Sequence, residues 1–133
     1  MKTISTQEAP AAGGHYSQAV VHGGLAYVAG QLPIVPGDPG RHLDSFEDQA
    51  ARVIDNVFAL LAAAGSRPDL VLKATVYLAD VAYWPRFNAV YAARMGGHRP
   101  ARTVVPVAAL HHGYLVEMDV IAALAQGEGR EKG

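Results

Sequence analysis

The segment that most constrains the fold is residues 70–79, a run of strong β-formers with apolar side chains on both of its faces. In an extended strand Leu72 and Val76 point one way, whereas Val71 and Tyr77 point the other way. Exposed apolar surface is unfavourable in water, so both faces of this strand need cover. The fold must therefore place one layer on each side of a sheet, or another molecule must supply the second layer.

Two helices are predicted, one before this strand and one after it. Between residues 45 and 64, apolar side chains recur at steps of three and four and form one stripe. Asp44 is placed to cap the start of this helix, with Glu47 as its reciprocal partner, and Gly65 is placed to end it. The second helix is predicted over about residues 84–95.

The remaining apolar segments are predicted as strands. Residues 17–31 form a hairpin in which Gly23 and Gly24 make a two-residue turn, because both glycines accept a positive φ. Two further strands, at about 102–109 and 114–124, close the domain. The element order is therefore β-β-α-β-α-β-β, which predicts an α+β fold with a mixed sheet and two helices packed on one face.

A single domain is predicted over residues 1–125, followed by a polar, glycine-rich tail at 126–133 that we expect to be flexible. Two helices can cover only one face of the sheet, although its strands carry apolar residues on both. Self-association is the economical way to cover the second face, through a two-fold or three-fold assembly of this chain.

The composition excludes several classes of protein. Half of the 133 residues are apolar, which is enough for a core, and the net charge of −1 leaves no basic excess for a nucleic acid. The chain has no cysteine, and its histidines lack the helical spacing of a metal site, so no bound metal is expected. No apolar run is long enough to span a bilayer and no signal peptide is visible, which predicts a cytoplasmic protein.

The two closing strands are predicted to pair through a four-residue loop, which places Ala109 opposite Tyr114. In this register Arg102, Glu117 and Asp119 share one face, and the apolar residues of both strands face the helices. The charged residues then lie on the face assigned to self-association. Two interpretations remain open: salt bridges across an interface, or a polar pocket where arginine binds a carboxylate and a carboxylate activates water.

Five motifs occur in one register over about residues 2–124. They are Ala-Pro-Ala-Ala at 9–12 followed by Tyr16, Ala-Gly-Gln-Leu-Pro at 29–33, Asp-Asn-Val at 55–57, Pro-Ala-Arg-Thr at 100–103 and Leu-Val-Glu-Met-Asp-Val-Ile-Ala at 115–122. Together they resemble the Rid family, the reactive-intermediate deaminases, which are also called the endoribonuclease L-PSP family. Each motif alone is weak, whereas their combination is specific.

This resemblance implies a chorismate-mutase-like α+β fold that assembles as a homotrimer with one cleft between each pair of subunits. Members of the deaminase branch hydrolyse reactive enamines and imines that carry a carboxylate, such as 2-aminoacrylate released by pyridoxal-phosphate enzymes. The products are 2-oxo acids and ammonia, and no metal or organic cofactor takes part. The implied partners are a small-molecule substrate and two further copies of the chain, without nucleic acid or membrane.

The resemblance also implies roles for five residues. Arg102 corresponds to the arginine that holds the substrate carboxylate, and Glu117 to the acidic residue linked to the hydrolytic water. Tyr16 corresponds to a tyrosine that lines the cleft, and Gly30 to the glycine of the Gly-Gln motif. Asn88 falls where members often have a structurally placed asparagine. An iminium carbon is already electrophilic, so these groups need only orient it and deliver water.

The sequence also departs from the family pattern near these positions, which leaves the substrate range open. The departures are His15, Ala29, Val104, Pro106, and the pair His111 and His112 in place of a Pro-Gly-type turn. Arg102 favours the deaminase branch, because branches without this arginine lack the activity. The alternatives are a non-catalytic trimer that binds a small carboxylate, a pathway-specific Rid-like enzyme, and an endoribonuclease, against which the neutral charge counts.

Overall fold

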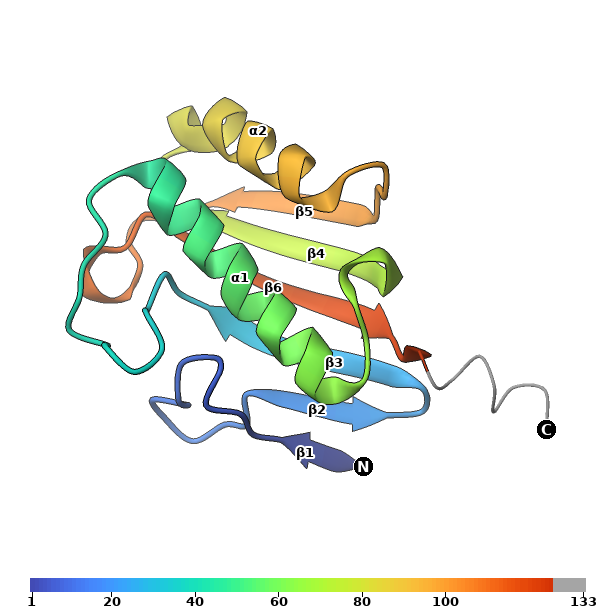
Figure 1. Ribbon diagram of the computed structural model, residues 1–133. Helices are drawn as coiled ribbons and strands as arrows, with labels where there is room; N and C mark the ends of the chain where they lie inside the picture. The colour runs from blue at the N-terminus through green and yellow to red at the C-terminus, as the bar shows by residue number, and fades with distance from the viewer. Residues whose placement is uncertain (126–133) are drawn as a thin grey trace.

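The computed structural model describes residues 1–125, and the tail predicted at 126–133 lies outside the described residues. One six-stranded sheet carries both α-helices on the same face (Figure 1). The strands are β1 (Lys2–Ile4), β2 (Ala19–His22), β3 (Leu25–Gln31), β4 (Val71–Leu78), β5 (Ala101–Pro106) and β6 (Val116–Ala123). The helices are α1 (Phe46–Ala64), α2 (Trp84–Met95) and the short 3₁₀ segments η1 (Pro68–Leu70), η2 (Val81–Tyr83) and η3 (His111–Gly113).

Both predicted α-helices are confirmed, but the predicted cap of α1 is wrong by one residue. The N-cap is Ser45, whose side chain accepts a hydrogen bond of 3.0 Å from the backbone N–H of Asp48. Ser45 has the extended backbone that a cap requires. Its hydroxyl, and not the carboxylate of Asp44, therefore accepts the hydrogen bond from the third amide of the helix. Gly65 ends the helix in the left-handed conformation, with φ 87°, as predicted.

The first hairpin is confirmed, and one strand that the sequence pattern did not reveal lies beside it. Gly23 and Gly24 form the turn with φ of 61° and 80°, and Val20 pairs with Tyr27 across the hairpin. The additional strand β1 pairs antiparallel with β2, through Thr3 opposite Val20. With three residues it is too short to show an alternating pattern.

The closing hairpin predicted from the sequence is wrong. The strand order is β1-β2-β3-β6-β4-β5, so β4 lies between the two strands that were expected to pair. The β4–α2–β5 connection makes β5 parallel to β4, and β6 then pairs antiparallel with the other edge of β4. The N–H of Val107 donates to the carbonyl of Leu78, and the N–H of Ala79 donates to the carbonyl of Leu115. The connection between β5 and β6 therefore passes around the end of β4.

This strand order also overturns the predicted faces of the charged residues. Arg102 pairs with Ala74, which pairs in turn with Val120, so these three side chains share the face that the helices cover. Glu117 pairs with Tyr77, which is an odd number of residues from Ala74 and points to the opposite face. Arg102 and Glu117 consequently lie on opposite faces of the sheet, because β5 and β6 each take their register from β4. The same register places Thr103 and Val105, which were expected to face the helices, on the side of Glu117.

The start of β4 also departs from the predicted alternation. The pairing with β6 shifts register between Val71 and Lys73, which marks a bulge. Val71 is therefore buried on the core side, whereas Leu72 is 50% exposed. Beyond the bulge the predicted alternation holds, and Ala74, Val76 and Leu78 are buried.

The core lies between the sheet and the two helices, and it defines one covered face and one open face. Its largest fully buried side chains are Phe46, Ile54, Leu60, Leu61, Leu78, Phe87 and Met118. On the other face, Tyr27 is 42% exposed, and Ile121, Thr75 and Tyr77 are only partly buried. This second face, called the open face below, has neither α-helix packed on it (Figure 1). None of the helices within residues 1–125 has the length and apolar character needed to cross a membrane.

Candidate active site

The structure brings three of the five sequence-predicted site residues together and holds the other two elsewhere. Tyr16, Gly30 and Glu117 line one pocket of about 490 Å³, here called the Glu117 pocket. Arg102 lies on the edge strand β5, on the covered face of the sheet. Asn88 lies on α2. The candidate site of one chain therefore consists of two separate halves.

Glu117 is the chemical centre of the first half. It lies in β6 on the open face and is partly buried. Burial raises the pKa of the Glu117 carboxyl, and the nearby charge of Asp119 raises it further, whereas His111 lowers it. Asp119 accepts a hydrogen bond of 2.9 Å from the hydroxyl of Tyr77. A carboxyl with a raised pKa holds a proton more readily than an ordinary one, which suits a group that takes up and returns a proton during a reaction.

Gly30 is required where β3 passes Glu117. The pairing of β3 with β6 shifts register between Val28 and Gln31, and this irregularity turns Gly30 toward the carboxyl group. A Cβ atom at position 30 would collide with Oε2 of Glu117 and lie 3.2 Å from its Cδ. The absence of a side chain therefore lets the backbone of β3 approach the carboxylate closely.

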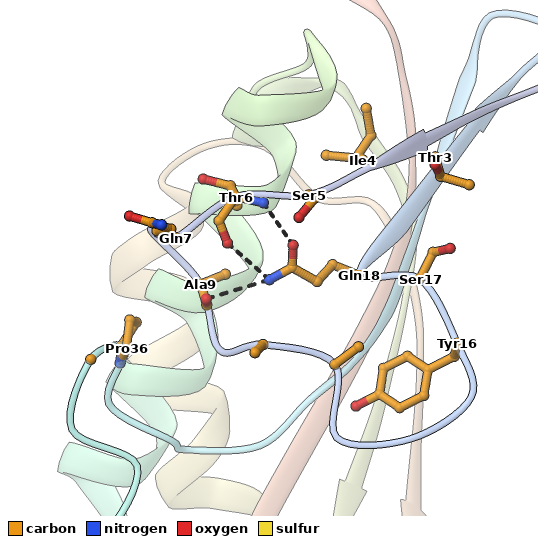
Figure 2. Close-up of a pocket in the computed structure, with 13 residues that line it drawn as sticks. Thr3, Ile4, Ser5, Thr6, Gln7, Ala9, Tyr16, Ser17, Gln18 and Pro36 are labelled. Carbon is orange, nitrogen blue, oxygen red and sulfur yellow. Dashed lines mark hydrogen bonds between the residues drawn. The ribbon is translucent and has the colours of Figure 1, made fainter.

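Tyr16 belongs to the loop between β1 and β2, which the buried side chain of Gln18 holds in place. Gln18 accepts a hydrogen bond of 2.7 Å from the N–H of Thr6, and its amide donates to the carbonyls of Thr6 and Pro10. Figure 2 shows Gln18 reaching back into this loop beside a second pocket, which Tyr16 also lines. The hydroxyl of Tyr16 accepts a hydrogen bond of 3.1 Å from the N–H of Gly13, so its partly exposed ring has a defined position.

The second half of the site surrounds Arg102. Its guanidinium carbon lies 4.9 Å from the ring centre of Tyr91 and 5.4 Å from that of Trp84, both on α2. Asn88 is four residues from Trp84 and three from Tyr91, so it lies on the same side of the helix. Within residues 1–125, the buried hydroxyl of Tyr91 has no hydrogen-bond partner. The Arg102 guanidinium thus lies over two aromatic rings of α2 at the edge of the sheet, and one of these rings carries the unpartnered hydroxyl.

Sequence reasoning assigned no role to Asn56, although the structure makes it a positioning residue. Asn56 is fully buried, and its amide donates to the carbonyls of Leu32 and Ile34 at 3.1 and 2.9 Å. Its side-chain oxygen accepts a hydrogen bond from Nε of Arg52. Leu32 and Ile34 both line the Glu117 pocket. The sequence did contain one sign of this role: the carboxamide of Asn56 lies next to the apolar stripe of the first helix, where a buried polar group without a partner would be costly.

Within residues 1–125, no three His, Asp or Glu side chains are grouped so that they could hold a metal ion.

Comparison with known proteins identifies the family to which this fold and these motifs belong. The profile of the endoribonuclease L-PSP family matches residues 6–124, and the chain belongs to this family. The protein HMF1 of Saccharomyces cerevisiae is 41% identical over 120 residues, which cover 90% of this chain and 92% of the yeast protein. Reactive Intermediate Deaminase A of Arabidopsis thaliana, a chloroplastic protein, is 37% identical over 124 residues, covering 92% of this chain and 66% of that protein.

A solved structure extends the likeness to the whole fold. The crystal structure of Escherichia coli TdcF with bound serine superimposes with a TM-score of 0.89 at 33% identity, covering 94% of this chain and 100% of that one. The resemblance to the Rid family and the predicted chorismate-mutase-like α+β fold, with a mixed sheet and two helices on one face, are thereby confirmed.

Proposed function

We propose that this protein hydrolyses 2-enamines and 2-imines that carry a carboxylate, of the 2-aminoacrylate type, to 2-oxo acids and ammonia. The reaction takes place in clefts between the subunits of a homotrimer. The observation that carries the proposal is the division of the motif residues into two halves, with Arg102 and Asn88 at one edge and Glu117, Gly30 and Tyr16 on the open face. The likeness to a relative named as a reactive intermediate deaminase supports the reaction type.

Assembly explains why the halves are separate in one chain. The open face carries partly exposed apolar side chains, among them Tyr27 and Ile121, that need cover. If the β5 edge of one subunit docks on the open face of the next, Arg102 of the first reaches Glu117 of the second. A three-fold ring of such contacts closes on itself and forms three equivalent clefts.

The chemistry follows from the residue types. Arg102 binds the substrate carboxylate through two parallel hydrogen bonds, which fixes the imine carbon opposite Glu117. An enamine first takes a proton at its terminal carbon and becomes the iminium ion. Glu117 then removes a proton from water as the oxygen bonds to the iminium carbon, which forms a carbinolamine. The proton passes to the nitrogen, the C–N bond breaks, ammonia leaves, and loss of the hydroxyl proton gives the 2-oxo acid.

A binding function without catalysis is the second candidate. The related TdcF was crystallised with serine, a small amino acid with a carboxylate, and this observation favours a site for such ligands. In both candidate functions Arg102 binds the carboxylate of the ligand through two hydrogen bonds, an arrangement here called the Arg102 clamp. They differ in whether Glu117 activates water. They are separated by turnover, because a binding protein leaves the rate of imine hydrolysis unchanged.

The test generates 2-aminoacrylate in solution with a pyridoxal-phosphate lyase and follows the release of ammonia. We expect the wild-type protein to accelerate hydrolysis of the imine. With an Arg102→Ala variant, hydrolysis should proceed only at the spontaneous rate. Light scattering on both samples should give about 42 kDa, three times the 14.0 kDa chain. A stable monomer at micromolar concentration would contradict the shared clefts, and an unchanged hydrolysis rate in an intact trimer would favour the binding function.

The cytoplasmic location stays a prediction from the sequence. The family includes a chloroplastic relative in Arabidopsis and a mitochondrial one in yeast, so membership alone fixes no compartment.

A further inference from the structure

Four aromatic rings lie in succession beside the Glu117 pocket. The rings of His42 and Tyr114 are stacked, with centroids 5.0 Å apart and an angle of 5° between their planes. His112 meets Tyr114 edge to face at 6.0 Å, and His111 meets His112 edge to face at 5.7 Å. These separations are those of favourable aromatic contacts. The three histidines are exposed, so their outer surfaces are free for further contacts.

Three of these rings line a further pocket that adjoins the Glu117 pocket. A pocket of about 510 Å³, here called the ring pocket, is lined by Ile34, Pro39, Gly40, His42, His112 and Tyr114. Ile34 and His112 line the Glu117 pocket as well, so the two pockets meet at these residues. A molecule whose reacting carbon lies at Glu117 can therefore extend its side chain past His112 into the ring pocket.

The backbone at His112 indicates that its ring is needed at this place. His112 has φ 59° and ψ 21°, and it is the only residue other than glycine with a positive φ in the described part of the chain. Glycine or asparagine adopts this conformation with less strain. A strained residue at the junction of two pockets is typical of a functional position.

We propose that the ring pocket is a subsite for the aromatic side chain of the substrate, so that this protein acts preferentially on aryl-bearing 2-imino acids. The inference rests on the proposed function and names its substrate class. An aryl group bound there would contact Ile34 and stack on or against the exposed imidazole rings. A methyl side chain, as in the imine formed from 2-aminoacrylate, has no ring to stack on the imidazoles.

The lining of the two pockets favours an aromatic side chain over a charged one. Among the described residues that line either pocket there is no lysine or arginine, which an acidic side chain would require for a strong contact. The ring pocket likewise contains no carboxylate among its described lining residues. Aromatic and aliphatic side chains are the usual lining of a pocket that binds a planar apolar group.

The experiment compares two imines on four proteins. Phenylalanine-derived imine is generated with an L-amino-acid oxidase, and the small imine comes from 2-aminoacrylate. The proteins are the wild type, His112→Asn, His112→Phe and the control His22→Asn, which changes an exposed histidine that lines neither pocket. We expect His112→Asn to lower kcat/KM for the aryl imine about tenfold more than it lowers kcat/KM for the small imine. His112→Phe and His22→Asn should retain the aryl activity.

The outcomes separate this inference from the proposed function. Wild-type hydrolysis of the small imine without any preference for the aryl imine overturns the subsite, and so does an equal loss of both activities in His112→Asn. If neither imine is hydrolysed, titration calorimetry measures the affinities for phenylpyruvate and pyruvate, and their difference decides whether the subsite exists. Tighter binding of phenylpyruvate that His112→Asn abolishes supports the subsite without catalysis, and equal binding overturns it.

Discussion

Arg102 and Glu117 lie on opposite faces of one sheet, on β5 and β6, with β4 between them. Arg102 rests on Tyr91 and Trp84 beneath α2, while Glu117 faces the pocket that Tyr16 and Gly30 line. Neither side chain can reach the other through the packed core of its own chain. If both act on one substrate, they must come from different subunits.

Mixed assemblies should therefore regain the activity that two inactive variants lack. An Arg102→Ala subunit still presents Glu117, and a Glu117→Gln subunit still presents Arg102. After unfolding and refolding the two variants together in equal amounts, we expect about a quarter of the wild-type activity, because one interface in four joins the two intact residues. The activity of imine hydrolysis is measured on the refolded mixture.

The control for this experiment is the double variant Arg102→Ala/Glu117→Gln mixed with either single variant. In such a mixture no cleft contains both intact residues, so the activity should stay at the background level. Recovery in the control, or none in the mixture of single variants despite intact trimers, would contradict a site shared between subunits.

The Arg102 clamp should not tolerate lysine. Lysine keeps the charge but loses the planar fork that binds a carboxylate through two hydrogen bonds, and a misplaced imine is attacked slowly by water. Arg102→Lys should lose about 3–5 kcal/mol of transition-state stabilisation, almost as much as Arg102→Ala. The checks are kcat/KM for 2-aminoacrylate and light scattering. An active Arg102→Lys enzyme would support the alternative of an interface salt bridge.

The water-activating role of Glu117 is tested by a substitution that keeps its shape. Glu117→Gln should lower turnover about 10²–10⁴-fold while the trimer survives.

The pH profile of the wild-type enzyme should report the raised pKa of Glu117. Because this base must be ionised to act, the acid limb of the profile should lie above the ordinary value of 4.5. Asp119→Asn should move this limb to lower pH, since it removes a charge that raises the pKa of Glu117.

Ionisation of Glu117 should lower the stability of the fold as the pH rises, although the same ionisation is needed for activity. The folded chain holds the proton of Glu117 more tightly than the unfolded chain does, so this group stabilises the fold below about pH 4.5 and the contribution is lost as the pH rises through its folded pKa. Glu117→Gln should therefore gain stability relative to the wild type between pH 4 and pH 8. Urea unfolding at both pH values measures the difference, and a variant that becomes relatively less stable at pH 8 would contradict the raised pKa.

Gly30 should be sensitive to a single added methyl group. In Gly30→Ala the new Cβ would collide with Oε2 of Glu117 and force the carboxylate to move. Displacement of a reacting group by about 1 Å costs on the order of 10²-fold in rate. We expect that loss in kcat/KM, with the trimer retained. Gly97→Ala is the matched control, because a Cβ there has no atom within 4 Å and Gly97 does not line the Glu117 pocket, and it should remain active.

The sequence by itself determined the local elements. Steps of three and four in the apolar residues predicted α1, and two adjacent glycines predicted the turn between β2 and β3, because both depend on residues that are close along the chain. The motif residues also identified the family. The cap of α1 was misplaced by one residue, since Asp44 and Ser45 are both good capping residues and the structure has Ser45 in the capping position.

The tertiary structure alone decided the strand order, and with it the arrangement of the site. A short loop between two strands favours a hairpin, but β4 has two edges that both need hydrogen bonds, and inside the sheet β5 and β6 satisfy one edge each. This pairing links residues that are distant in sequence, so no local pattern reports it. It reversed the face of Arg102 relative to Glu117, because a strand's side chains alternate and its register with a neighbour fixes which of them face the helices.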